Sequence, residues 1–208
     1  MIVRDRILEA AVRVYGAHGF RGATTKRIAE AAGVNEVTLF RTFGSKAALI
    51  DAAIRNRAGR DDIPRLPAKP VDPTAELTAW ATDIHAHMRR MRSMIRKCMS
   101  EMEERPAMSG AACEGPSWAH HELRGYFSRV QTAGLMAPGV DHHVASTMLM
   151  SSLFGDAMGR DMMPSIYPPA SSAAEQYVRV IARALGLPAT TRATKRAGVS
   201  RAAASAAS

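Results

Sequence analysis

Residues 24–46 read TTKRIAEAAGVNEVTLFRTFGSK, and this stretch constrains the fold more than any other part of the sequence. Ala29, Gly33 and Leu39 lie at the spacing that a helix-turn-helix requires. Such a motif needs a small residue where two helices cross, a residue that tolerates positive φ in the turn, and an aliphatic anchor on the second helix. We therefore predict a first helix that ends at Gly33 and a second that begins after the cap residue Asn35.

The second helix of this motif has two different faces. Leu39 and Phe43 are one helical turn apart, so both are expected to point inward. The opposite face carries Glu36, Val37, Thr38, Arg41 and Thr42. Two short amphipathic helices without a binding role would show the same spacing. The cap, the anchors and the basic exterior together favour a DNA-binding helix.

Short motifs around these helices extend the pattern: His18-Gly19-Phe20, Ala23-Thr24-Thr25, Ile28-Ala29, Ala32-Gly33-Val34, Thr38-Leu39-Phe40-Arg41-Thr42-Phe43, and Ser45-Lys46 with Leu49 behind it. With them, residues 2–58 resemble the DNA-binding domain of the TetR (tetracycline-repressor-like) family of bacterial transcription regulators. The resemblance covers about a quarter of the chain. It implies an all-α fold, with an N-terminal three-helix helix-turn-helix domain and a C-terminal helical domain for ligand binding and dimerisation.

The resemblance also implies which side chains touch DNA. Thr25 and Lys46 would bind phosphates, whereas Phe40 stands where the family usually has a phosphate-binding tyrosine and offers packing only. Base contacts are expected from Glu36 to cytosine, Val37 to a thymine methyl and Arg41 to guanine. For Glu36 the alternative is a simple helix-dipole interaction. The complete expected set is Thr25, Lys26, Asn35, Glu36, Val37, Thr38, Phe40, Arg41, Thr42 and Lys46.

The charge of the chain is unevenly distributed. Of the net +9, residues 1–60 contribute +6, from 11 Lys/Arg against 5 Asp/Glu, and residues 186–208 contribute +4. The part between them carries −1, from 13 Lys/Arg against 14 Asp/Glu. The positive field therefore lies on the helix-turn-helix and the tail, and it favours a polyanionic partner such as double-stranded DNA.

We predict four segments along the chain. The helix-turn-helix domain covers residues 1–59, and a connector over 60–73 carries a proline at every third position from Pro64. Such a repeat favours a stiff extended segment over a PxxP recognition ligand. Residues 74–187 show helical periodicity throughout, with no alternating β pattern. The basic tail, 188–208, is expected to be disordered.

Within 74–187 the boundaries come from cap signals. Asp72 and Pro73 are expected to open a long helix, with a possible break near 89–92, and residues 106–115 are expected to form a loop. Asp141 is expected to cap a later helix, and Ser172-x-x-Glu175 resembles a capping box before the last one.

The last two long helices are the expected dimer surface, because the resemblance implies a four-helix bundle across a two-fold axis. Small residues among them would allow close approach. A homodimer would pair two DNA-binding helices on a palindromic operator. The expected interface residues are Ser151, Ser152, Gly155, Met158, Tyr177, Val178 and Ile181.

A small-molecule effector is a further implication of the resemblance. Twelve of the 13 methionines follow residue 87, and flexible methionines suit an adaptable apolar pocket, although a core role is the simpler interpretation for each one. The expected pocket residues are Trp80, Ile84, Met88, Met91, Trp118, Phe127 and Phe154. A basic cluster over 89–97 would suit an acidic ligand such as an acyl-CoA, but a solvated helix face is favoured.

Other classes of function fit the sequence less well. The histidine pairs at 120–121 and 142–143 are adjacent, so they diverge on a helix and do not form a metal site, and no enzyme motif is present. We expect a non-enzymatic protein without a cofactor. A metal-responsive regulator and a sequence-tolerant nucleoid-type protein remain alternatives. Two cysteines, no signal-peptide core and no membrane-length apolar run indicate a cytoplasmic protein.

Overall fold

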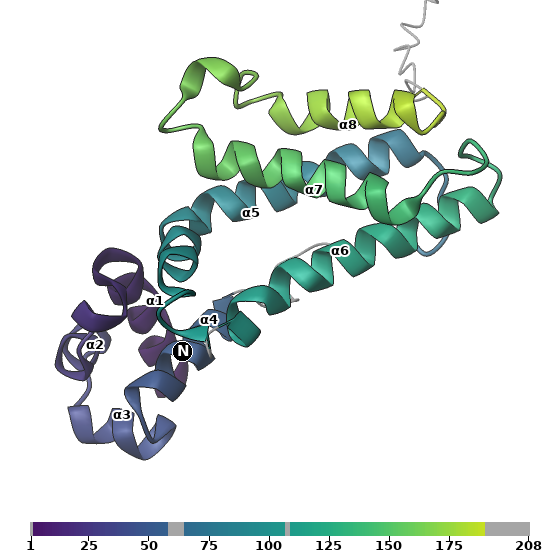
Figure 1. Ribbon diagram of the computed structural model, residues 1–208. Helices are drawn as coiled ribbons and strands as arrows, with labels where there is room; N and C mark the ends of the chain where they lie inside the picture. The colour runs from purple at the N-terminus through teal and green to yellow at the C-terminus, as the bar shows by residue number, and fades with distance from the viewer. Residues whose placement is uncertain (1, 58–64, 107–108, 190–208) are drawn as a thin grey trace, which may run out of the picture.

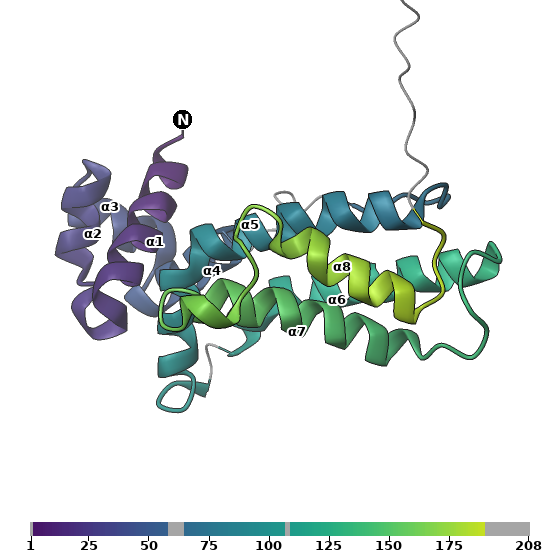
Figure 2. The same ribbon diagram turned by 90° about the horizontal axis from the view of Figure 1, so that it is seen from above.

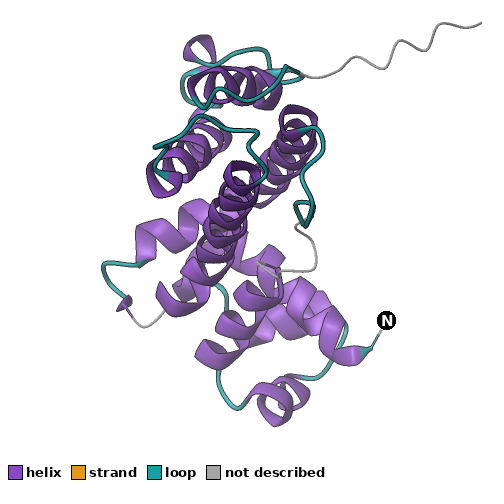
Figure 3. Cartoon of the chain, turned by 90° about the vertical axis from the view of Figure 1, so that its right-hand side faces the viewer, coloured by secondary structure: helices purple, strands orange, loops and turns teal. Residues whose placement is uncertain are grey.

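The structure is a computed structural model that describes residues 2–57, 65–106 and 109–189. Over these ranges every regular element is a helix, which confirms the predicted all-α class (Figures 1 and 3). The elements are α1 (Val3–Gly22), α2 (Thr25–Ala32), α3 (Glu36–Phe43), α4 (Lys46–Arg57), α5 (Pro73–Glu101), α6 (Ser109–Thr132), α7 (His142–Gly159), the 3-10 helix η3 (Pro164–Ile166) and α8 (Ala173–Ala184). None of the described helices has the length and apolar character needed to cross a membrane.

Local hydrogen bonds define the helix-turn-helix as the sequence predicts. Gly33 adopts left-handed backbone angles (φ 64°, ψ 42°) at the end of α2, a conformation that costs glycine little. The Asn35 side chain accepts a hydrogen bond from the backbone N–H of Val37 at 2.9 Å and so caps α3. The predicted turn and cap are confirmed.

The N-terminal core is completed by parts of the chain beyond residue 59. Ile7, Leu8 and Tyr15 of α1 are buried against α2–α4. The same apolar cluster contains Met91, Met94 and Cys98 from α5 and Ala111 from α6. The predicted boundaries therefore describe the order of the segments along the chain. The N-terminal core, however, contains side chains from both sides of the predicted boundary at residue 59. Gly59, Pro64 and residues 190–208 lie outside the described residues.

Two predicted features of the middle of the chain are wrong. α5 is one unbroken helix of 29 residues, so residues 89–92 do not interrupt it. α6 begins at Ser109 and contains Pro116, so residues 109–115 are helical and not a loop. Ala111 is buried in the N-terminal core, and this tertiary packing outweighs the low helix propensity of the glycines and the proline.

Helices α5–α8 enclose a second apolar core. Trp80 of α5, Phe127 of α6, Leu149 of α7 and Val178 of α8 are all buried in it. Figure 2 shows α8 lying across both α5 and α7. The predicted capping box before α8 is absent, because the Ser172 side chain makes no cap bond and instead accepts a hydrogen bond from Gln176 Nε2 at 3.0 Å.

Candidate DNA-binding surface and effector cavity

One face of helix α3 packs against the N-terminal core, and the opposite face is exposed to solvent. Its anchor, Leu39, is 2% exposed in the N-terminal core, whereas Val37 is 70% exposed. Five more residues of the expected DNA-binding set are exposed: Lys26, Asn35, Phe40, Arg41 and Thr42. Figure 1 shows α2 and α3 at the end of the molecule that is farthest from α8. An outward helix of this kind can enter the major groove of DNA without any rearrangement of the core.

Thr25 and Glu36 interact with each other instead of standing free. The Thr25 hydroxyl donates a hydrogen bond to Glu36 Oε1 at 2.6 Å and so joins the start of α2 to the start of α3. The Glu36 carboxylate also lies in the first turn of α3, where the helix dipole favours an acid. In this arrangement Glu36 helps to position the motif, and the Thr25 hydroxyl reaches a phosphate only by rotating away from Glu36.

Lys46 is half-buried at the start of α4. Its ammonium lies 4.3 Å from the centre of the Phe20 ring and 3.5 Å from the Arg21 carbonyl oxygen. Partial burial and the nearby Arg105 guanidinium lower the pKa of Lys46. The aromatic face and the carbonyl oxygen hold this cation in one place, next to the end of α1.

Known proteins resemble this N-terminal domain in sequence. Residues 7–53 match the model of the family described as bacterial regulatory proteins, tetR family. This match is confined to the N-terminal domain. An uncharacterised HTH-type transcriptional regulator of Bacillus subtilis, YvkB, is 47% identical over 49 residues, which are 24% of this chain and 26% of that protein. The HTH-type transcriptional repressor AcnR of Corynebacterium efficiens is 42% identical over 57 residues, 27% of this chain and 30% of that protein.

These matches span less than a third of each relative, so beyond the N-terminal domain the similarity to known TetR proteins is one of fold. A structure of a putative TetR-family regulator from Mesorhizobium loti aligns with a TM-score of 0.74 at 17% identity, over 89% of this chain and 97% of that one. The fatty acid degradation regulator FadR of Bacillus halodurans aligns with a TM-score of 0.71 at 19% identity, over 90% and 98%.

A cavity of about 380 Å³ lies between the helix-turn-helix domain and the C-terminal helices. It is mostly apolar and unusually rich in sulfur, since both cysteines and six methionines line it. The lining residues are Ile54 and Arg57 of α4; Ile84, His87, Met88, Met91, Met94, Ile95, Cys98 and Met99 of α5, followed by Met102; Ala112, Cys113, Gly115, Pro116, Ala119 and His120 of α6; and Met150, Ser151 and Phe154 of α7.

Four of the seven expected pocket residues line this cavity: Ile84, Met88, Met91 and Phe154. The other three do not line it. Trp80 and Phe127 are buried in the C-terminal core, and the Trp118 ring lies 5.7 Å from the Arg65 guanidinium. The cavity is closer to the N-terminal domain than expected. The methionine stripe from 88 to 102 marked α5 as its wall, but no signal in the sequence showed that α4 takes part.

The expected dimer residues fall into two groups. Met158, Val178 and Ile181 are buried within the protomer, and Val178 and Ile181 belong to the C-terminal core, so these three side chains offer little surface to a partner. Ser151 is exposed, and Ser152 and Gly155 are half-buried on α7. The apolar side chains that do face solvent on these helices are Val144 (51% exposed), Met148 (55%) and Val180 (67%).

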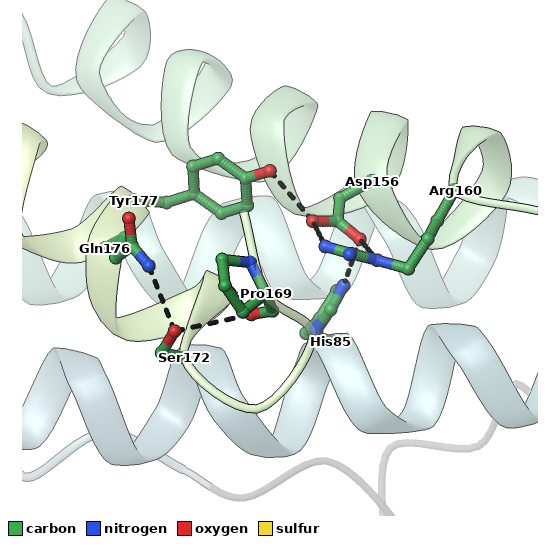
Figure 4. A network of polar contacts seen from close by, with 7 residues as sticks. All are labelled: His85, Asp156, Arg160, Pro169, Ser172, Gln176 and Tyr177. Atoms are coloured by element: carbon green, nitrogen blue, oxygen red, sulfur yellow. Dashed lines mark hydrogen bonds and ion pairs between the residues drawn. The ribbon is translucent and has the colours of Figure 1, made fainter. Parts of the chain in front are cut away.

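Tyr177, the remaining expected dimer residue, belongs to a polar network inside the C-terminal domain (Figure 4). Its hydroxyl donates a hydrogen bond to Asp156 Oδ2 at 2.8 Å. Asp156 also accepts from Arg160 Nε at 2.8 Å and hydrogen-bonds with His85 Nε2 at 3.0 Å. Burial by itself would raise the pKa of Asp156, but the bonds from Arg160, Tyr177 and His85 outweigh it and lower that pKa.

Two arginines of the basic cluster over 89–97 have partners within the protein. Of the basic cluster on α5, Arg92 Nε pairs with Asp161 at 2.9 Å, and Arg96 donates a hydrogen bond to the Met158 carbonyl oxygen. In the part of the chain that the structure describes, no three His, Cys, Asp or Glu side chains converge in a way that would hold a metal ion.

Proposed function

We propose that this protein is a TetR-family regulator of transcription that binds double-stranded DNA in a sequence-specific way. The observation that carries the proposal is the outward face of α3, which Leu39 anchors from behind. Arg41 and Val37 are exposed on this face, and their chemistry suits guanine and the thymine methyl respectively. AcnR, with 42% identity over 57 residues, is named as a transcriptional repressor, and this supports repression as the regulatory outcome here.

We further propose that the regulator acts as a homodimer on a palindromic operator. One helix-turn-helix gives a small interface with weak discrimination, and two copies related by a two-fold axis read two half-sites. Val144, Met148 and Val180 supply exposed apolar area on the outer faces of α7 and α8. Such a patch supports self-association, because burying it removes apolar surface from water.

The proposed effector is a small apolar molecule that binds in the 380 Å³ cavity and releases the operator. The volume and the apolar methionine-rich wall suit a ligand of this kind. A solved FadR of Bacillus subtilis, with 16% identity and a TM-score of 0.68, contains stearoyl-CoA, which shows an apolar-chain ligand in a protein of the same fold. A ligand in the cavity lowers DNA affinity only if it binds the DNA-incompetent arrangement more tightly.

The test is selection of bound duplexes from random DNA, followed by competition at physiological salt. The expected product is a palindrome bound at least about 10³-fold more tightly than unrelated DNA. Arg41→Ala should weaken binding to that palindrome by roughly 10-fold or more, because a bidentate base contact contributes about 1–3 kcal/mol. The fold should be unaffected, since Arg41 is exposed.

Two outcomes would count against this function. Selection that yields no preferred sequence would favour the sequence-tolerant, nucleoid-type alternative. Equal affinity of the wild-type protein and Arg41→Ala for the palindrome would remove α3 from the DNA interface.

A further inference from the structure

The C-terminal end of α5 is hydrogen-bonded to α1 near the corner between α1 and α2. The Glu101 carboxylate accepts a hydrogen bond from the Tyr15 hydroxyl at 3.0 Å and another from the backbone N–H of Phe20 at 2.7 Å. Both bonds have an ionised acceptor, which makes them stronger than bonds between neutral groups. They join segments 81 and 86 residues apart in the sequence.

The α1–α2 corner, residues 19–24, is built around this carboxylate. Gly19 has φ 66° and ψ −177°, outside the helical region, although α1 continues past it. A Cβ atom at Gly19 would lie 2.6 Å from Glu101 Oε1, closer than such contacts occur. Both the positive φ and the close approach of Glu101 therefore require glycine at this position.

The Phe20 ring connects this hydrogen-bonded corner with Lys46, a candidate DNA contact. The Arg105 guanidinium lies 3.1 Å from the ring centre, and the Lys46 ammonium lies 4.3 Å from it. Lys46 also donates a hydrogen bond to the carbonyl oxygen of Arg21, in the same corner. The position of the Lys46 ammonium therefore follows the position of the corner, which Glu101 fixes.

The same end of α5 forms part of the cavity wall. Cys98, Met99 and Met102 line the cavity, and Glu101, the last residue of α5, lies between them in the sequence. Cys98 and Tyr15 lie in the same buried apolar cluster, and the Tyr15 hydroxyl is hydrogen-bonded to Glu101. A short run of contacts thus connects the cavity wall with the α1–α2 corner.

We propose that Glu101 is a positioning residue for DNA binding, which holds the α1–α2 corner so that Lys46 is placed to pair with a DNA phosphate. Because Glu101 lies at the same end of α5 as the cavity-lining residues Cys98 and Met99, a shift of this end of α5 changes the phosphate contact without any movement of α3 relative to its own core. This inference rests on the proposed function.

The test uses the full-length protein and the duplex that wild-type protein selects from random DNA. Glu101→Gln keeps the size of the side chain but removes the charge, and it should weaken binding about tenfold. Glu103→Gln is the matched control: Glu103 is an exposed acid two residues away, and its replacement makes the same change in net charge. Added positive charge alone strengthens DNA binding, so the control should bind as well as wild type or better.

A thermodynamic cycle with Lys46→Gln separates positioning from general destabilisation. If Glu101 acts through Lys46, the double variant should bind no more weakly than Lys46→Gln alone, and both should show a salt dependence reduced by about one unit for each lost phosphate contact. Should Glu101→Gln fail to fold, Tyr15→Phe removes one of the two donors to Glu101 without a change in charge, and about threefold weaker binding is expected.

Three results would overturn the inference. The first is that Glu101→Gln binds the selected duplex as tightly as Glu103→Gln, or that Tyr15→Phe in its place binds it as tightly as the wild-type protein. The second is that the losses from Glu101→Gln and Lys46→Gln add. The third is that wild-type protein selects no duplex, and only this result would overturn the proposed function as well.

Discussion

Asp156 shows how a single side chain ties three helices of the C-terminal domain together. Its fully buried carboxylate, on α7, accepts bonds from Tyr177 on α8 and from Arg160 just beyond α7, and it hydrogen-bonds with His85 on α5. A buried charge is tolerated only where opposite charge and hydrogen bonds compensate for lost hydration, and here they do. The sequence did not reveal this network, because its members are up to 92 residues apart, from position 85 to 177, and share no local pattern.

Replacing Asp156 with asparagine should therefore destabilise the protein by about 3 kcal/mol at pH 7, because the Arg160 charge loses its buried partner. The folded-state pKa of Asp156 is below the unfolded value, so its contribution is present at neutral pH and is lost as the pH falls below about 3.8 towards the folded-state value. The difference between Asp156→Asn and wild type should thus shrink in acid. Urea unfolding at pH 7 and at low pH measures this difference.

Asp161→Asn provides the control, because Asp161 pairs with Arg92 in a half-exposed ion pair. Its loss should cost less than about 1 kcal/mol. Equal stability of Asp156→Asn and Asp161→Asn at pH 7 would contradict the structural role assigned to the buried network.

At the scale of helices, the sequence predicts best where the cause is local. The left-handed Gly33 and the caps at Asn35, Asp72 and Asp141 all depend on residues within three positions, and all four occur in the structure. The start of α6 was mispredicted for the opposite reason. Burial of Ala111 against the N-terminal core decides it, and that contact cannot be seen in a local window.

Helix α3 offers a direct test of the division between anchor and exposed face. Leu39→Ala should cost about 3 kcal/mol of stability, because it leaves a cavity in the N-terminal core. Val37→Ala, on the exposed face, should change stability by no more than about 0.5 kcal/mol while lowering preference for a thymine in the selected DNA. Thermal unfolding and binding to base-substituted duplexes measure the two effects. A larger loss of stability for Val37→Ala than for Leu39→Ala would mean that α3 presents the other face.

At the scale of the whole molecule, side chains from both domains form the N-terminal core and the wall of the cavity. The N-terminal core includes side chains of α5 and α6, and the cavity has Ile54 and Arg57 of α4 in its wall. The sequence indicated two domains and a methionine-rich lining. It placed the pocket too deep in the C-terminal core, at Trp80 and Phe127, because periodicity identifies buried faces but not which buried face borders an empty space.

The proposed dimer is the property of the whole molecule that a single substitution can test. Met148 is 55% exposed on α7, so Met148→Glu should leave the protomer folded but place a charge in the proposed interface. Two copies would bring two such charges into an apolar contact, where removal from water is costly. The expected result is a monomer by sedimentation at micromolar concentration, and operator affinity reduced by about 10²-fold or more as one half-site is lost.

Val71→Glu is the matched control for that experiment, because Val71 is an apolar residue of 82% exposure that precedes α5 and is not part of α7 or α8. It introduces the same charge without touching the proposed interface, so it should sediment and bind DNA as wild type does. If both variants and wild type sediment alike as dimers, the exposed face of α7 is not the interface. If wild type itself is a monomer that still binds the palindrome at full affinity, each half-site is read independently, and dimerisation contributes nothing to recognition.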